Sequence, residues 1–240
     1  MDKHTLDALI AARKAKRPVA LVSDIASGAQ AVVTAERVDG TLVLDATAVA
    51  AARERLADDR SGRIEDANGR RLFVQVNNPP KRLIVVGAVH IAQPLVEMAR
   101  TAGYAVAIVD PRGAFATRER FPGVTLSEDW PDDAVTALGL DTRTAVVTLT
   151  HDPKLDDPAL ATALRSACFY IGALGSKRTH AARLERLRRL GFSDAELARI
   201  HGPVGLDIGA ASPAEIAVSI LAQIVQVLHR SSAPAQRDAA

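Results

Sequence analysis

The chain has 240 residues, of which 48% are hydrophobic, 24% charged and 3% aromatic. This length is enough for one large or two small domains with buried cores. The formal net charge is +2, from 30 basic and 28 acidic side chains, so the basic excess typical of nucleic-acid-binding domains is missing. The low aromatic content also argues against stacking on single-stranded bases. Nucleic acid is therefore not an expected partner.

The cysteine content and the apolar segments bear on the compartment. One cysteine, Cys168, excludes an internal disulfide framework and a zinc site built from several cysteines. The N-terminus has no apolar segment of the kind found in secretory signals. The longest apolar stretches, residues 83–92 and 216–228, contain polar side chains and are too short to span a bilayer. We therefore expect a cytoplasmic protein without a membrane span.

Residues 1–78 are expected to form a small α+β domain. Apolar spacing predicts helices at 5–15 and 47–56 and strands at 19–22, 31–38, 41–44 and 72–76. Two dipeptides, Asp39-Gly40 and Asn68-Gly69, favour tight hairpin turns. The following segment, residues 77–81, contains Pro79 and Pro80, which remove hydrogen-bond donors and restrict the residues before them. This segment is the expected linker.

Residues 79–230 alternate between short apolar strands and helices. The expected strands lie at 83–86, 105–109, 124–125, 144–149 and 168–171, and the expected helices at 91–102, 131–138, 158–166, 177–190, after Ser193, and at 213–229. Strands that are apolar throughout are buried on both faces, and helical crossovers indicate a parallel sheet. The predicted fold class is α/β, a Rossmann-like doubly wound parallel sheet preceded by the smaller α+β domain. The polar tail, residues 231–240, is expected to be disordered.

Ligands of open parallel sheets bind at the carboxyl ends of the strands. The first such loop starts at Gly87 and replaces a G-x-G-x-x-G fingerprint, but Val89 stands where the second glycine should be, which weakens the case for NAD(P). A tight turn without a ligand explains this loop equally well, and His90 either caps the next helix or faces a ligand. Asp110 ends the second strand, where a Rossmann acid contacts ribose, while Arg112 either binds a phosphate or pairs with Asp110.

The third loop carries a hydroxyl, an imidazole and a carboxylate. His151 and Asp152 suit general acid–base chemistry or metal binding. One histidine and one carboxylate adjacent in sequence do not make a metal site by themselves, so whether a metal binds stays undetermined. Asp157, which precedes Pro158, is expected to cap the next helix.

The fourth loop is the most informative. Gly172, Gly175 and Ser176 lead into a helix whose first turn carries Lys177 and Arg178. Each cation at a helix N-terminus is disfavoured by about 0.3 to 1 kcal/mol. We therefore expect a bound anion such as a phosphate, with Ser176 and backbone amides donating, unless both cations extend into solvent. The arginines further along are interpreted as a solvated helix face: Arg183, Arg186, Arg188 and Arg189.

The last loop, residues 202–209, is punctuated by glycines and carries one carboxylate. Asp207 lies between Leu206 and Ile208 and needs partners if it is buried. It either binds the amides of its own loop or shapes a ligand pocket together with the Gly175 loop.

Taken together, these motifs resemble the XdhC/CoxF/CoxI family. They are Gly87-Ala88-Val89-His90-Ile91-Ala92, Val109-Asp110-Pro111-Arg112, Thr150-His151-Asp152 with Asp156-Asp157-Pro158, residues 170–178, and residues 203–209 followed by Pro213-Ala214-Glu215-Ile216-Ala217. The resemblance covers residues 82–229. It implies an accessory protein that binds molybdenum cofactor (molybdopterin) and assists its insertion into a molybdenum hydroxylase apoenzyme, such as xanthine or carbon monoxide dehydrogenase. Such a chaperone need not catalyse a reaction.

The resemblance implies that the cofactor lies in a cleft at this edge of the sheet. The expected cofactor-binding residues are Gly87, His90, Asp110, Arg112, His151, Asp152, Gly172, Gly175, Ser176, Lys177, Arg178 and Asp207. The first domain departs from the family, because residues 26–30 replace a G-S-x-P-R signature and no cysteine precedes Cys168. A thiolate ligand for molybdenum from that domain is thereby excluded.

Three alternatives remain open at this point. The chain is a divergent member that works with a second, complete XdhC-like protein, or a binding-only subunit that keeps the partner surface and has lost cofactor handling, or an NAD(P)-binding oxidoreductase, which Asp110 favours and Val89 opposes. We also expect a homo-oligomer.

Overall fold

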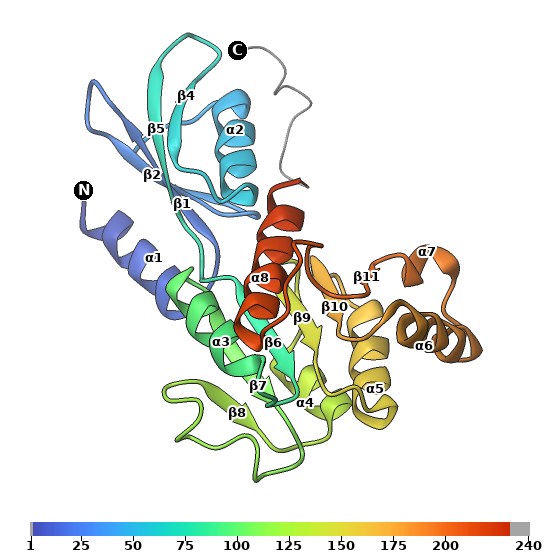
Figure 1. Ribbon diagram of the computed structural model, residues 1–240. Coiled ribbons are helices and arrows are strands. Elements are labelled where there is room, and N and C mark those ends of the chain that lie inside the picture. The colour runs from blue at the N-terminus through green and yellow to red at the C-terminus, as the bar shows by residue number, and fades with distance from the viewer. Residues whose placement is uncertain (1, 231–240) are drawn as a thin grey trace. The chain divides into compact units, whose positions relative to one another are not determined.

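The computed structural model describes residues 2–230 (Figure 1), so the predicted disorder of residues 231–240 falls outside the described residues. The chain divides into two compact units, Met1–Pro79 and Pro80–Ala240. Within residues 2–230, no helix combines the length and the apolar character that crossing a membrane requires.

The first unit is an antiparallel five-stranded sheet with two helices. Its strands are β1 (Val19–Asp24), β2 (Gln30–Val33), β3 (Val38–Gly40), β4 (Gly62–Glu65) and β5 (Arg71–Asn77), in the order β3-β2-β1-β5-β4, and its helices are α1 (Lys3–Lys14) and α2 (Ala46–Ala57). Alternate residues of the central strand β1 point to opposite faces. Leu21 therefore packs with the α1 side chain Ala12, and Val22 with the α2 side chain Ala52.

Both predicted helices are present in this unit, but the predictions for residues 31–44 are wrong. The predicted strand 31–38 is divided into β2 and β3, because the Thr34 hydroxyl accepts hydrogen bonds from the amides of Glu36 and Arg37 and turns the chain there. Asp39-Gly40 therefore lies within β3, and residues 41–44 form no strand. The Asn68-Gly69 turn is confirmed: it joins β4 to β5, with Gly69 at a φ of +75°.

The second unit contains a parallel six-stranded sheet, which confirms the predicted Rossmann-like fold class. Its strands are β6 (Arg82–Val86), β7 (Ala105–Val109), β8 (Thr125–Ser127), β9 (Thr144–Thr148), β10 (Tyr170–Ala173) and β11 (Ile200–His201), in the order β11-β10-β9-β6-β7-β8. Strand β10 begins two residues later than predicted, and β11 was not predicted.

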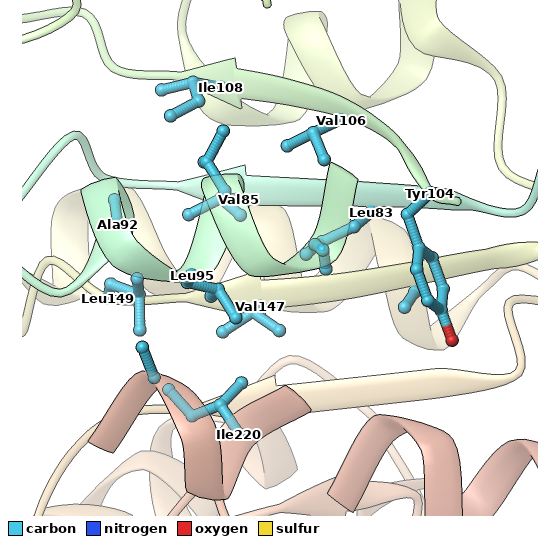
Figure 2. Packing of buried hydrophobic residues seen from close by; sticks show 14 of the residues in the cluster. Leu83, Val85, Ala92, Leu95, Tyr104, Val106, Ile108, Val147, Leu149 and Ile220 are labelled. Atoms are coloured by element: carbon cyan, nitrogen blue, oxygen red, sulfur yellow. The ribbon is translucent and has the colours of Figure 1, made fainter. Parts of the chain in front are cut away.

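Helices cover both faces of this sheet (Figure 1). They are α3 (Ala92–Thr101), α4 (Pro131–Leu138), α5 (Pro153–Leu164), α6 (Lys177–Arg189), α7 (Asp194–Leu197) and α8 (Pro213–Arg230). On one face, Val85 and Val147 pack with Leu95 of α3 and Ile220 of α8 (Figure 2). On the other face, buried strand side chains pack with α4, α5 and α6. The apolar strands are therefore buried on both faces, as their composition predicts.

Helix α5 begins earlier than expected. The Asp152 carboxylate accepts a hydrogen bond from the Lys154 amide (2.9 Å), and Pro153 occupies the first turn, so the helix starts there and Pro158 lies inside it. The prediction that Asp157 caps this helix is therefore wrong. Asp152 and Pro153 supply a cap and a first-turn proline ahead of Asp157 and Pro158, so the helix starts at the earlier pair.

The order of the strands determines where loops meet. From β6 the chain proceeds to β7 and β8 on one side, and then crosses to β9, β10 and β11 on the other side. The order therefore reverses between β6 and β9. Open parallel sheets bind ligands outside the carboxyl ends of their strands at such a point.

Candidate functional site

Gly87 is required where the loops after β6 and β9 approach each other. Its φ is +109°, and a Cβ atom at this position would lie 2.7 Å from Cγ2 of Thr150. Its amide donates to the carbonyl of Val109 (2.8 Å), at the end of β7. The close approach of two protein loops therefore explains this glycine without a pyrophosphate.

Asp110 is fully buried and saturated with hydrogen bonds. Its carboxylate accepts from the Ala88 amide (2.8 Å), from the Arg112 amide (3.0 Å), and from Nε and Nη2 of Arg112 (2.8 Å each). Burial opposes ionisation, but the hydrogen bonds from Arg112 and Ala88 outweigh it and hold the pKa of Asp110 below its usual value. Of the two alternatives for Arg112, the structure has the ion pair.

The long segment after β7 is fastened to the Gly87 loop by Arg120. Nη1 of Arg120 donates to the carbonyls of Ala88 (2.8 Å) and Phe115 (2.6 Å), and Nη2 donates to Oε1 of Gln93 (3.3 Å). The side chain of Val89 is half-buried against the core on the α3 side. The place of a dinucleotide fingerprint is therefore occupied by contacts within the protein.

We expect neither NAD nor NADP to bind with micromolar affinity in calorimetric titration. A carboxylate has about four lone-pair sites, and those of Asp110 are already used by Ala88 and Arg112, so none is left for a ribose hydroxyl. Thermal unfolding in millimolar nucleotide is an independent check, because a ligand that binds the folded state raises the Tm. A micromolar Kd from the titration, together with a raised Tm, would contradict this expectation and favour the oxidoreductase alternative.

The β9–α5 loop holds two of the predicted site residues. His151 is exposed and adopts a φ of +61°, which is uncommon for residues other than glycine. The Asp152 carboxylate caps α5. In the part of the chain that the structure describes, no three His, Cys, Asp or Glu side chains are grouped as metal ligands would be.

Behind this loop lies a buried ion pair. Oδ1 of Asp156 accepts from Oγ1 of Thr150 (2.7 Å) and from its amide (3.3 Å). Oδ2 of Asp156 lies 3.6 Å from Nη2 of Arg183, and the two side chains are only 1% and 2% exposed. The prediction that Arg183 belongs to a solvated helix face is therefore wrong.

Two further arginines of α6 also have partners. Arg186 pairs with Asp157, and Arg188 pairs with Glu185 and Asp194. Arg189 is exposed and matches the predicted solvated face.

The N-terminus of α6 collects positive charge. The Ser176 hydroxyl caps the helix by accepting from the Thr179 amide (3.2 Å), and the first turn contains no carboxylate. Lys177 and Arg178 are exposed there. Long helical side chains point toward the N-terminus, and Arg183 accordingly reaches back so that its Nη2 donates to the Leu174 carbonyl (2.8 Å). Lys177 and Arg178 are thus exposed at this helix N-terminus, and Arg183 is hydrogen-bonded to the loop that precedes it.

The loop after β11 is packed onto β10 and α8. The Val204 amide donates to the Ala173 carbonyl (3.1 Å), and a Cβ atom on Gly172 would lie 2.6 Å from Cγ2 of Val204. Asp207 is exposed in this loop, so it does not need the buried partners that the sequence would otherwise demand. The predicted pocket between Asp207 and the Gly175 loop stays a prediction.

His90 is exposed in the turn before α3 and does not cap that helix. The residue at the cap position is Ile91, and no side chain caps the first turn. Within the described chain, His90, His151, Lys177, Arg178 and Asp207 make no hydrogen bond or ion pair with one another. They are open to solvent at loops that the parallel strands bring to one edge.

A continuous series of contacts joins these loops, and we call it the edge network. Its links are the hydrogen bond from Ala88 to Asp110, the close approach of Gly87 to Thr150, the hydrogen bond from Thr150 to Asp156, the ion pair of Asp156 with Arg183, and the hydrogen bond from Arg183 to Leu174. The network crosses the loops after β7, β6, β9 and β10, four neighbouring strands.

Electrostatics connect the same loops. The hydrogen bond with Asp110 is the main reason why the pKa of Arg112 is raised, and the charges of Asp152 and Asp156 add to it. The β7 and β9 loops therefore lie within electrostatic range of each other.

Sequence reasoning missed Thr150, Asp156 and Arg183 as members of one network. One signal was present for Arg183: it precedes the buried Leu187 by four residues, so both lie on the same face of α6. No comparable signal pairs it with Asp156, because that contact depends on how α5 and α6 pack.

The strand order defines a Rossmann-type domain, a class in which ligands bind at the carboxyl edge of the sheet. The family model of the XdhC Rossmann domain matches residues 83–224. The chain belongs to the XdhC family, which confirms the resemblance seen in its motifs.

Three curated relatives are similar to the chain over its larger part. The molybdenum cofactor insertion chaperone PaoD of Escherichia coli K12 is 35% identical over 153 residues, which are 63% of this chain and 42% of PaoD. A probable xanthine dehydrogenase subunit of Bacillus subtilis 168 is 32% identical over 160 residues, 66% of this chain and 46% of the relative. The protein YqeB of E. coli K12 is 33% identical over 165 residues, 68% and 30% of the two chains.

The chain spans less than half the length of these relatives. Among solved structures, a xanthine dehydrogenase from Bacillus halodurans is similar, with a TM-score of 0.71 and 27% identity, over 98% of this chain and 65% of that one. The likeness to this structure therefore extends over both units of the chain.

Proposed function

We propose that this protein is a chaperone that binds molybdenum cofactor and assists its insertion into a molybdenum hydroxylase apoenzyme of the xanthine or carbon monoxide dehydrogenase type. Membership of the XdhC family and the similarity to the chaperone PaoD support the proposal. The observation that carries it is the positive N-terminus of α6, where Lys177 and Arg178 occupy a first turn without a carboxylate. The cofactor is the cargo of this protein.

The residues present fit the anionic end of such a cargo. A pyranopterin phosphate matches a helix N-terminus, where the first amides have no partner within the helix and the macrodipole favours negative charge. Ser176 satisfies only the amide of Thr179. In our proposal Lys177, Arg178 and the adjacent amides hold the phosphate, and Gly175, with a φ of +145°, lets the backbone of this loop come close. Gly172 lies inside β10 against Val204, so its part is to shape the sheet edge.

The chain is poorly equipped to hold the molybdenum end through sulfur. Its one cysteine, Cys168, is buried, and burial raises the pKa of its thiol. We therefore propose that the cargo is held through its phosphate and its pterin. His90, His151 and Asp207 border the site from neighbouring loops, whereas Asp110, Arg112 and Asp152 act by shaping those loops.

We place the protein in the cytoplasm with a molybdenum hydroxylase apoenzyme as its partner, in line with the molybdenum cofactor chaperone among its relatives. A second XdhC-like partner and a homo-oligomer stay predictions, to be checked by pull-down from a native lysate and by light scattering.

The test is retention of cargo. We expect pterin fluorescence and molybdenum to co-elute with the protein when cofactor is supplied, and Lys177→Ala/Arg178→Ala to weaken retention at least tenfold, because a hydrogen bond to a charged group contributes roughly 1.5–3 kcal/mol. Arg188→Ala/Arg189→Ala is the matched control, since it removes the same charge from the other end of α6. If the wild-type protein retains no pterin, or if both double variants lose it equally, the proposal is wrong.

A further inference from the structure

The side chains of Asp156 and Arg183 are almost fully buried, although they make no hydrogen bond with each other. The closest charged atoms are 3.6 Å apart, beyond a hydrogen bond. Oδ2 of Asp156 and Nε and Nη1 of Arg183 are buried without a hydrogen-bond partner among residues 2–230. Burial raises the pKa of Asp156 and lowers that of Arg183, which indicates that the site disfavours both charges. Such a pair is a weak source of stability, because replacing buried pairs by apolar side chains is often neutral or stabilising.

The hydrogen bonds that the pair does make lead to two loops. Asp156 accepts twice from Thr150, in the β9–α5 loop. Arg183 donates to the carbonyl of Leu174, in the β10–α6 loop. The pair therefore connects the loop that carries His151 to the loop that precedes Lys177 and Arg178.

A neighbouring pair shows what this connection adds. Arg186 and Asp157 lie close by on the same two helices, and Nη2 of Arg186 is 3.0 Å from Oδ1 of Asp157. This pair is more exposed, and its hydrogen bonds join the two side chains to each other. Helices α5 and α6 are therefore already joined without Asp156 and Arg183, and the particular contribution of the buried pair is its contact with both loops.

We infer that Asp156 and Arg183 are positioning residues of the cargo site, which hold the β9–α5 and β10–α6 loops at a fixed separation so that the α6 N-terminus faces the cargo. Neither residue needs to touch the cargo, because their polar atoms are buried behind the loops. This inference rests on the proposed function for its effect on cargo, while its effect on the loops can be measured in the free protein.

The decisive comparison is between two double variants. Asp156→Leu/Arg183→Met removes the buried pair without leaving an isolated charge, and Asp157→Leu/Arg186→Met removes the neighbouring pair from the same helices. We expect both proteins to fold. The first is expected to retain cargo roughly tenfold less tightly, which is the lower end of the losses seen when residues that support metal ligands are removed. It is also expected to show faster amide hydrogen exchange in residues 149–152 and 174–179. The second is expected to behave like the wild type in both measurements.

A pair of single variants covers the case in which the first double variant does not fold. Thr150→Val removes the hydroxyl that donates to Asp156, whereas Thr150→Ser keeps it. We expect Thr150→Val to speed exchange in both loops and to weaken cargo retention, and Thr150→Ser to restore both.

The outcomes separate the inference from the proposed function. Wild-type retention and wild-type loop exchange in Asp156→Leu/Arg183→Met would overturn the positioning role and leave the cargo site intact. Equal losses in the two double variants would overturn it as well, because they would point to the general packing of α5 on α6. A wild-type protein that binds no supplied cofactor would overturn the proposed function, and the exchange measurements would still decide the positioning role.

Discussion

Arg183→Met is expected to lower the free energy of unfolding by about 3–5 kcal/mol, which is the usual effect of removing one partner from a buried pair. The loss arises mainly from Asp156, whose side chain is 1% exposed and would be left ionised without a counter-charge. The Leu174 carbonyl also loses its donor. Urea-induced unfolding near neutral pH measures the difference directly.

The effect should depend on pH in a defined direction. Burial raises the pKa of Asp156 in the folded protein, so ionisation of this carboxyl destabilises the fold above that pKa and has no such effect below the ordinary pKa of aspartate. In Arg183→Met the counter-charge is gone and the pKa rises further. The deficit relative to the wild type is therefore largest near neutral pH and shrinks as acidification protonates Asp156.

Arg186→Met is the control for this prediction. Arg186 is 34% and Asp157 12% exposed, against 2% and 1% for Arg183 and Asp156, so we expect a smaller loss than in Arg183→Met. A similar loss in Arg183→Met and Arg186→Met, or a deficit of Arg183→Met that does not change with pH, would show that Asp156 is not the source of the effect.

Gly87→Ala is expected to destabilise the protein by about 2–5 kcal/mol. Part of this, about 1–2 kcal/mol, comes from placing a Cβ atom on a residue with positive φ. The rest, about 1–3 kcal/mol, comes from overpacking, because the new atom would lie 2.7 Å from Cγ2 and 3.2 Å from the amide nitrogen of Thr150. Backbone cannot rotate away as a flexible side chain does, so the β6 and β9 loops must separate.

Gly103→Ala provides the comparison. Gly103 follows α3 with a φ of +87°, and no atom lies within 4 Å of a Cβ atom built there. This variant should therefore show the conformational cost alone. The two melting temperatures, measured by circular dichroism, should differ clearly, and equal shifts would mean that Gly87 is chosen for its φ and not for the contact with Thr150.

The class of fold was predictable because burial leaves a periodic pattern in the sequence. Strands such as β6 and β9 contain continuous apolar runs, residues 83–86 and 145–147, which indicated a sheet covered on both faces, and the spacing between them indicated helical crossovers. The family was predictable for a different reason: its motifs lie in loops, where the residue types follow the needs of a site and not of the core.

The local errors came from competition between signals. Pro158 indicated the start of α5, but Asp152 and Pro153 supply an earlier cap and an earlier first turn. The predicted strand 31–38 contained Thr34, whose hydroxyl stabilises a turn when the chain lets it reach the next amides. In both cases the sequence carried two valid signals, and the packing of the whole unit chose between them.

By itself, the sequence determined the Rossmann-like fold class, the XdhC family and the loops in which to look for a site. Only the tertiary structure decided which polar groups of those loops are free. Asp110 was a candidate ribose ligand and is saturated by Ala88 and Arg112, and Arg183 was assigned to solvent and lies buried beside Asp156. The physical reason is that periodicity reports burial along one element, whereas hydrogen bonds and ion pairs join loops whose residues are far apart in the chain and meet only when the strands align.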